Sequence, residues 1–410
     1  MLRIAGIFST ISLLVVAMAV PRHRGIPMRL TSEAYVWQST ARAETRDAMA
    51  TAADLDCLHI LAAEVAWRDK QLVVATMPVD PAIHPPARTG RVIRLGQSTA
   101  SLIWTDERVA ILAGAARTLA ASRPREIQID YDCPASRLGG YRKLLDNMQA
   151  VVPDVPVVFT ALPSWLDAPG FAALARAHPG YILQVHSLDL PSSAGAPVVL
   201  CDPAAARRAV ARAAMHGVPF RLALPTYGSE ILFDANGRVV DVVSEDRPSS
   251  KAARAVTRQQ VMADAPALAR LVAELLRAHP PALTGLVWYR LPVATDRRNW
   301  PWQTFDAVRQ GKPVAPHLEI SFATTGTGSH DIVLANTGTA PARLPAAIAL
   351  PPGTTAADAA RPYRVADDAA RLILAPDDLS WRWLQAGERR TIGWIRHPAP
   401  PPSLAVPESK

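Results

Sequence analysis

The stretch REIQIDYDCPASRLGGYRKLL, residues 125 to 145, decides the predicted fold. Gln128, Asp130 and Asp132 occupy every second position, and the residues that alternate with them are isoleucine, isoleucine and tyrosine. Because successive side chains of a strand point to opposite faces, the three polar groups share one side. Apolar residues at helical spacing follow from Leu138 onward. The stretch therefore predicts a strand with one polar face and then a helix, the repeating unit of a parallel α/β fold.

The same unit recurs along most of the chain. A short apolar run, a loop and a segment with helical spacing follow one another, and the predicted strands are 34–38, 58–64, 92–96, 127–132, 157–161, 181–186, 220–225 and 285–291. Eight such units in about 250 residues predict a closed (β/α)8, TIM-like barrel over residues 30–312. An open doubly wound sheet is the alternative, but no glycine-rich nucleotide-binding motif follows an early strand.

Two segments depart from the simple repeat. The connection 68–90 contains a possible extra strand at 72–75. Asn236-Gly237 lies between two apolar runs and predicts a hairpin over 231–243, which would overhang the face where barrels bind ligands. A helix is predicted over 253–278, before the last barrel strand.

The C-terminal part of the chain follows a different pattern. Short alternating runs separated by turn signals predict a small all-β sandwich over residues 316–396. A Pro-rich tail, 397–410, is expected to be extended.

The N-terminus resembles an export signal. Arg3, an apolar run from Ile4 to Val16 and the tripeptide Ala17-Met18-Ala19 predict a signal peptide over residues 1–19. Periplasmic location or secretion follows from that prediction. An uncleaved inner-membrane anchor facing the periplasm is the competing interpretation, because the apolar run is at the short limit for a membrane span.

The cysteine content and the net charge limit the disulfides, metal sites and partners that can be expected. Cys57, Cys133 and Cys201 are too few for a disulfide scaffold, although one bridge between Cys133 and Cys201 remains an open alternative. No Cys or His spacing is typical of a zinc site, so neither a metal nor another cofactor is expected. The net charge is +8 without a basic cluster, which argues against a nucleic-acid partner. The oligomeric state is not predicted.

Acidic residues lie where barrel enzymes carry their chemistry. The active sites of such enzymes are built at the carboxyl ends of the strands, and Asp132 ends the fourth predicted strand. Asp130 lies below it in the lumen and needs a partner, for which Arg94 on the neighbouring strand is nominated. Glu64 ends the second predicted strand and could supply a further carboxylate. We predict Asp132 as a general acid whose pKa Asp130 raises, with Glu64 as a charge-stabilising group.

Other strand ends carry aromatic and amide side chains. Flat apolar faces and bidentate hydrogen-bonding groups suit a polyhydroxylated ligand such as a carbohydrate polymer. The predicted substrate-binding residues are Trp37, Gln38, Arg94, Gln128, Gln184, His186, Tyr227, Tyr289 and Arg290. For His186 a structural position in the lumen is an equally open interpretation. For the acids the alternative is a structural ion-pair network.

Several ordered segments resemble a known family. IQIDYDCPASRLGGYRKLL, TALPSWL, LQVHSLDLP and FRLALPTYG resemble an uncharacterised family of exported bacterial proteins, domain of unknown function 3142, across roughly residues 30 to 300. This resemblance implies a barrel and export but no activity. More distantly, QIDYD is similar to the D-x-D-x-E strand signature of family 18 chitinase-like glycosidases, whose final Glu is the proton donor. Here Gln128 replaces the first Asp and the shorter Asp132 replaces that Glu.

Two functions follow from these observations. The first is a glycoside-hydrolase-like barrel that acts on an envelope or extracellular glycan by carboxyl acid catalysis. The second is a non-catalytic protein that binds polysaccharide or takes part in envelope assembly.

Overall fold

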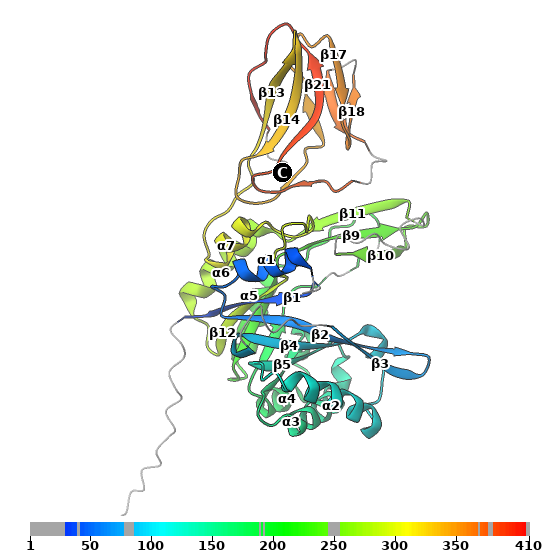
Figure 1. Ribbon diagram of the computed structural model, residues 1–410, viewed down its shortest axis with the longest axis vertical. Coiled ribbons are helices and arrows are strands. Elements are labelled where there is room, and N and C mark those ends of the chain that lie inside the picture. Colours follow the sequence, from blue (N-terminus) through cyan, green and yellow to red (C-terminus); the bar gives the residue numbers. More distant parts are fainter. Residues whose placement is uncertain are drawn as a thin grey trace, which may run out of the picture.

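The computed structural model describes residues 29–38, 42–77, 86–187, 190–191, 193–244, 255–367, 370–375 and 380–406 (Figure 1). The predicted signal peptide lies outside the described residues. Among the described residues no helix is both long and apolar enough to cross a membrane.

Eight parallel strands close into the predicted barrel. The ring is complete because β1 pairs with β12 on one side and with β2 on the other. Around the ring the strands are β1 (Thr31–Val36), β12 (Leu283–Tyr289), β8 (Phe220–Pro225), β7 (Tyr181–Gln184), β6 (Val157–Ala161), β5 (Glu126–Tyr131), β4 (Thr89–Leu95) and β2 (Cys57–Arg68). All eight predicted strands are present, and the closed α/β barrel is confirmed.

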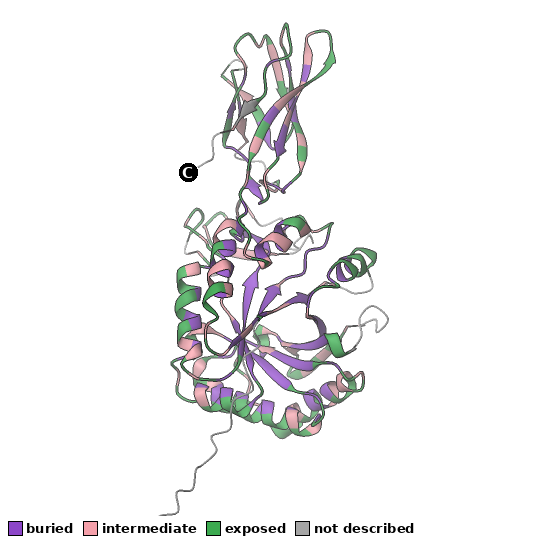
Figure 2. Cartoon of the chain, turned by 90° about the vertical axis from the view of Figure 1, so that its left-hand side faces the viewer, coloured by how far each residue is buried: buried purple, intermediate pink, exposed green. Residues whose placement is uncertain are grey.

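Helices surround the ring and supply the outer half of its core. Figure 2 shows buried strands in the centre and helices whose outer faces are exposed. The helices are α1 (Ala43–Thr51), α2 (Asp106–Ala120), α3 (Leu138–Val151), α4 (Phe171–Ala177), α5 (Pro203–Ala214), α6 (Ala265–Ala278) and α7 (Trp302–Arg309), with short 3-10 turns η1 (Pro86–Arg88), η2 (Gln97–Thr99), η3 (Ala135–Arg137) and η4 (Pro163–Trp165). In α3, Leu138, Tyr141, Leu144, Leu145 and Met148 are buried, which is the apolar stripe that helical spacing predicts.

The lumen is filled in layers. Near the amino ends of the strands lies a set of charged and polar side chains that we call the base network, Glu33, His59, Glu126, Gln128 and Arg221. Above it lies an apolar layer, Tyr35, Val92, Val158, Ile182, Ala223 and Val287. Arg94 and Asp130 follow at the carboxyl ends of their strands, and we call this end the barrel mouth.

The base network is fully paired. Arg221 donates to Glu33 Oε2 at 2.7 Å and to Glu126 Oε1 at 2.6 Å, and the nearby guanidinium holds the pKa of both carboxyls below the usual range despite their burial. His59 Nε2 lies 2.7 Å from Glu33 Oε2. The amide of Gln128 accepts from the Tyr35 hydroxyl at 2.8 Å, so its nitrogen faces His59 Nδ1, also at 2.8 Å. Burial disfavours a charged imidazole, but the neighbouring Cys57 and Glu33 outweigh this effect and raise the pKa of His59 to about 10.

Gly90 makes room for the imidazole. A Cβ built on Gly90 would lie 2.3 Å from His59 Nδ1, far inside van der Waals contact. The absence of a side chain at this position of β4 therefore allows His59 to lie flat in the lumen.

Two additions rise beyond the ring on the mouth side (Figure 1). The predicted extra strand is β3 (Gln71–Thr76), antiparallel to the long β2. The predicted hairpin is formed by β9 (Gly228–Phe233) and β10 (Val239–Val243), and a third strand, β11 (Thr257–Met262), pairs with β9. The helix predicted over 253–278 is therefore wrong in its first part. Asp264 caps α6 by accepting from Ala267 N, and the helix begins only there.

The C-terminal unit is the predicted sandwich of antiparallel sheets. One sheet contains β17 (Ala356–Ala359), β21 (Arg389–Arg396), β14 (Ser329–Asn336), β13 (Leu318–Gly326) and β22 (Leu404–Ala405); the others are β16 (Ala347–Ala349), β19 (Arg371–Leu374) and β18 (Tyr363–Ala366), and the pair β15 (Ala342–Arg343) and β20 (Trp383–Leu384). Inward side chains such as Ile332, Leu372 and Ile392 form a core separate from that of the barrel.

The two units are joined by hydrogen bonds as well as by the chain. Gln385 Nε2 donates to the carbonyls of Arg297 at 2.9 Å and Asn299 at 3.0 Å. Gln303 Nε2 donates to the Ala386 carbonyl at 2.8 Å. The sandwich is therefore fixed to the loop that follows β12 and to α7.

None of the three cysteines forms a disulfide. Cys57, Cys133 and Cys201 are buried and free. The disulfide left open by the sequence, between Cys133 and Cys201, is not formed.

Candidate functional site

Strand register brings three of the predicted site residues side by side. Glu64 on β2 pairs with Arg94 on β4, and Arg94 pairs with Asp130 on β5. Partners in a parallel ladder point to the same face, so the three side chains form a row on the lumen side at the mouth. A register shift between Leu61 and Ala63 turns Glu64 onto this face.

Asp130 is held by two neighbours. Thr160 on β6 donates its hydroxyl to Asp130 Oδ1 at 2.9 Å, and Arg94 Nη1 lies 4.0 Å from Oδ2. The ion pair that the sequence nominated between Arg94 and Asp130 is present, and the carboxyl is largely buried. Asp130 is thus a fixed, charge-balanced acid.

Asp132 follows β5 and is exposed at the mouth. Although the side chain reaches solvent, surrounding protein atoms partly desolvate its carboxyl, and the negative charge of Asp130 adds to this effect. Together they outweigh Arg94 and raise the pKa of Asp132 from 3.8 to about 6. A carboxyl with this pKa carries a proton for part of the time near neutrality, as a general acid must.

Arg94 lies among the acids. Partial burial disfavours its charge, yet Asp130, Asp132 and Glu64 more than compensate and raise the pKa of the guanidinium. Its terminal carbon lies 5.4 Å from the centre of the Trp37 ring, so that one face of the indole is covered by the cation. Glu64 itself is exposed.

An aromatic cluster forms another side of the mouth. Tyr289 is at its centre: its ring lies 5.2 Å from Trp37, 5.4 Å from Tyr227 and 5.2 Å from His186, on which it stacks. Burial lowers the pKa of His186 to about 3, so the imidazole is neutral. These four predicted residues are brought together.

The remaining predicted binding residues have structural contacts. Gln128 belongs to the base network and is fully buried. Arg290 is 1% exposed, and its guanidinium is bonded to Asp296 and to the Ser244 carbonyl. Gln38 and Gln184 are half-buried and donate to nearby backbone carbonyls at 3.4 and 3.3 Å.

Sequence reasoning missed Thr160 and the charged members of the base network. Thr160 lies in the run VVFTA, whose β-branched residues indicated a strand but no partner for Asp130. Successive side chains of a strand point to opposite faces. The argument that placed Gln128 in the lumen could therefore also have placed Glu33 on β1 and Arg221 on β8 there.

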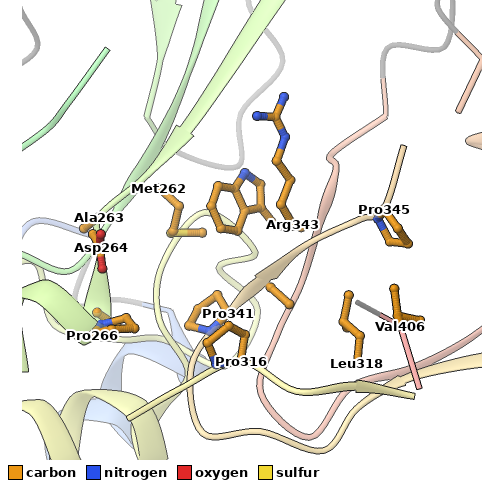
Figure 3. A pocket seen from close by; sticks show the side chains of 13 residues that line it. Met262, Ala263, Asp264, Pro266, Pro316, Leu318, Pro341, Arg343, Pro345 and Val406 are labelled. Atoms are coloured by element: carbon orange, nitrogen blue, oxygen red, sulfur yellow. The ribbon is translucent and has the colours of Figure 1, made fainter. Parts of the chain in front are cut away.

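Within the described residues, neither a group of metal-binding side chains nor the proline-lined cavity between barrel and sandwich offers an alternative functional site. The described residues include no group of three or more His, Cys, Asp or Glu that could hold a metal ion. A cavity of about 390 Å³ lies between barrel and sandwich and is lined by prolines from both units, including Pro266, Pro316 and Pro341 (Figure 3). Its carboxylate, Asp264, is engaged in capping α6, and none of the predicted site residues lines it.

Two protein families match this chain, one over the barrel and one over the sandwich. Residues 92–294 match the family described as Domain of unknown function (DUF3142), which confirms the resemblance seen in the sequence. Residues 321–397 match a second domain of unknown function (DUF8456). No curated protein matches the sequence.

Several solved structures are similar to this chain, among them a spore cortex-lytic enzyme and two chitinases. The spore cortex-lytic enzyme SleL of Bacillus cereus is 16% identical, with 64% of this chain and 71% of that chain covered and a TM-score of 0.46. The GH18 chitinase ChiB of Flavobacterium johnsoniae is 12% identical, with 69% and 94% covered and a TM-score of 0.47. Chitinase ChiA74 of Bacillus thuringiensis is 10% identical, with 92% and 100% covered and a TM-score of 0.44.

Proposed function

We propose that this protein is a glycoside-hydrolase-like barrel that binds a glycan at its mouth and protonates a glycosidic oxygen from Asp132. The observation that carries the proposal is the position of Asp132, exposed directly after β5 and beside the fixed pair Asp130 and Arg94, where its pKa is raised. Export and action on an envelope or extracellular glycan are part of the proposal, and they rest on the N-terminal sequence pattern alone.

Groups at the mouth and one water molecule can account for every proton and bond in the proposed hydrolysis. Asp132 gives its proton to the leaving oxygen as the bond from that oxygen to the anomeric carbon breaks. Positive charge then develops on the sugar ring, and the carboxylates of Asp130 and Glu64 stabilise it electrostatically. A water molecule adds its hydroxyl to the anomeric carbon, and its proton restores Asp132.

Asp132→Asn tests this role. We expect turnover to fall roughly a hundredfold or more, the range for loss of a general acid, while affinity for the glycan changes little. The assay is release of reducing ends from a panel of bacterial and fungal wall polysaccharides, with binding measured by calorimetry. Asp154→Asn is the matched control, because Asp154 is an exposed acid in the loop before β6, at the opposite end of the barrel.

The pH profile gives a second readout. A general acid must hold its proton, so kcat/KM is expected to fall as pH rises through about 6, the pKa of Asp132. The residual activity of Asp132→Asn should lack this limb. A wild-type profile that is flat across this range, with a measurable rate, would contradict the assignment.

A binding protein without catalysis is the second candidate. Asp130 and Asp132 leave the same strand on one side, so they do not flank a bond, and Arg94 lies among the mouth carboxyls. Glycan binding without turnover of any polymer by the parent protein would favour this function.

A further inference from the structure

Another cavity lies where the barrel meets the sandwich, next to the loop that leaves the mouth. Its volume is about 600 Å³, and its walls are one face of α1, the loop that links β12 to α7, and the turn between β20 and β21 of the sandwich. Both helices lie on the side of the barrel that faces the sandwich (Figure 1). The loop wall begins at Pro292, directly after Leu291, whose carbonyl accepts from Gln38 of the mouth at 3.4 Å. Binding sites for small molecules commonly have this size.

The sandwich wall of this cavity contains a buried acceptor without a partner. Gln385 lines the cavity, and its Nε2 donates to the carbonyls of Arg297 at 2.9 Å and Asn299 at 3.0 Å. Because both of these partners are acceptors, the amide nitrogen has to face them, and Oε1 is the atom that remains. This oxygen is buried and has no hydrogen-bond partner among the described residues. A buried acceptor of this kind is rare in proteins, and a donor from a ligand in the cavity would satisfy it.

The barrel walls supply an aromatic ring and further acceptors. Trp302, the first residue of α7, lines the cavity and is half-buried, so its indole offers a flat apolar surface. On α1, the side chains of Glu44 and Asp47 are exposed and form no hydrogen bond or ion pair with any described residue. An aromatic surface combined with amide and carboxylate acceptors suits a sugar, which has an apolar ring face and several hydroxyl donors.

Resting on the glycan binding proposed above, we infer that this cavity is a second glycan site, which binds an uncharged part of the polysaccharide chain whose neighbouring units occupy the mouth. Tyr289 of the mouth and Pro292 of the cavity are three residues apart, so their backbones lie within about 11 Å of each other, a gap that one polymer can bridge. An anionic polymer is disfavoured because it would meet the carboxylates of Glu44 and Asp47. The sandwich then has a role in binding, since its turn supplies one wall.

The test compares long and short forms of the same glycan. Calorimetric titrations use the hexasaccharides and disaccharides of β-1,4-linked N-acetylglucosamine, xylose and mannose. We expect one of the hexasaccharides to bind the parent protein about tenfold more tightly than its disaccharide, because a chain held at the mouth has a high effective concentration at the second site. The inference is overturned if no hexasaccharide binds, or if none binds more tightly than its disaccharide.

Two substitutions assign this hexasaccharide preference to the cavity. Trp302→Ala removes the aromatic surface, and Ala294→Trp fills the cavity from an exposed position of its loop wall, so the second variant provides the test if the first fails to fold. Each is expected to lower the ratio of hexasaccharide to disaccharide affinity by about tenfold, to near one. Trp394→Ala is the matched control, because this indole is 37% exposed on the sandwich and does not line the cavity. A ratio that both cavity variants leave unchanged would contradict the inference.

Failure of this inference and failure of the catalytic proposal give different results. If a glycan is hydrolysed and Asp132→Asn abolishes the reaction, but the cavity variants keep the full hexasaccharide preference, catalysis stands and the second site falls. If the cavity variants lose the preference but no glycan is hydrolysed, the second site stands and the catalytic role of Asp132 falls.

Discussion

At the scale of single residues, Arg221 is the buried cation on which the base network depends. It is 9% exposed and is the cation that bonds directly to both Glu33 and Glu126. Removal of the guanidinium would take from both buried carboxylates the cation that they share, although His59 would still contact Glu33 and Gln128 would still donate to Glu126. Buried carboxylates that lose their cation are far more costly than the intact network.

Arg221→Met is therefore expected to destabilise the protein by about 3–5 kcal/mol, the usual cost of breaking a buried ion pair. The measurement is urea unfolding followed by circular dichroism. Arg125→Met is the matched control: Arg125 also faces Glu33, but at 3.8 Å and with a side chain that is 40% exposed. Its loss should cost less than about 1 kcal/mol. Equal effects of the two substitutions would show that Arg221 does not hold the base network together.

The candidate site was predictable at this scale only in part. Alternation along β5 placed Asp130 and Asp132 on one side of the strand, and neighbouring strand ends suggested Arg94 as a partner. The same argument assigned Gln128 to a ligand, although the structure places it in the base network. Depth in the lumen depends on how the strands are staggered around the ring, and local sequence does not reveal that stagger.

At the scale of elements, β4 depends on the missing side chain of Gly90. The imidazole of His59 lies where a Cβ would be, and its nitrogens are held by Glu33 and Gln128, so it has no room to move aside. A strand position that would ordinarily favour a β-branched residue is thus restricted to glycine.

Gly90→Ala is expected to cost about 1–3 kcal/mol through overpacking. Gly114→Ala is the matched substitution within α2, where an added Cβ meets nothing within 4 Å, and it should stabilise by about 0.5–1 kcal/mol. Both values come from the same chemical unfolding experiment. If Gly90→Ala proved neutral, the close approach of His59 to β4 would be refuted.

Among the elements, the eight barrel strands were predictable because each is a short apolar run between helical segments. The strand β11 was not, because its residues TRQQVM adjoin a long alanine-rich segment and gain strand structure only by pairing with β9. Asp264 and Pro266 could have marked the true start of α6, since an acidic N-cap with proline in the first turn is a helix-start signal.

At the scale of the whole molecule, barrel and sandwich are coupled through a seam of hydrogen bonds, to which Thr304 and Gln260 of the barrel also contribute. Val314 and Ala340, from the linker and the sandwich side, belong to the barrel core. Three hydrogen bonds from Gln303 and Gln385 cross the seam. We therefore expect the two units to unfold together.

The double substitution Gln303→Ala, Gln385→Ala should weaken that coupling by roughly 2–4 kcal/mol, at about 1 kcal/mol for each hydrogen bond. Scanning calorimetry is expected to show one transition for the parent protein and an earlier, separate sandwich transition for the variant. Gln310→Ala is the control, because this exposed glutamine bonds only to Asp306 within the barrel. Two transitions already present in the parent would contradict the expected coupling.

The apolar layer of Tyr35, Val92, Val158, Ile182, Ala223 and Val287 separates two sets of ionic groups. Folding depends on the lower set, while the proposed chemistry uses only the upper one. Mutation at positions 64, 130 and 132 should thus be tolerated by the scaffold even when it abolishes every activity. Because the two sets are independent, related barrels could change or lose their catalytic activity and still keep the base network that stabilises the fold.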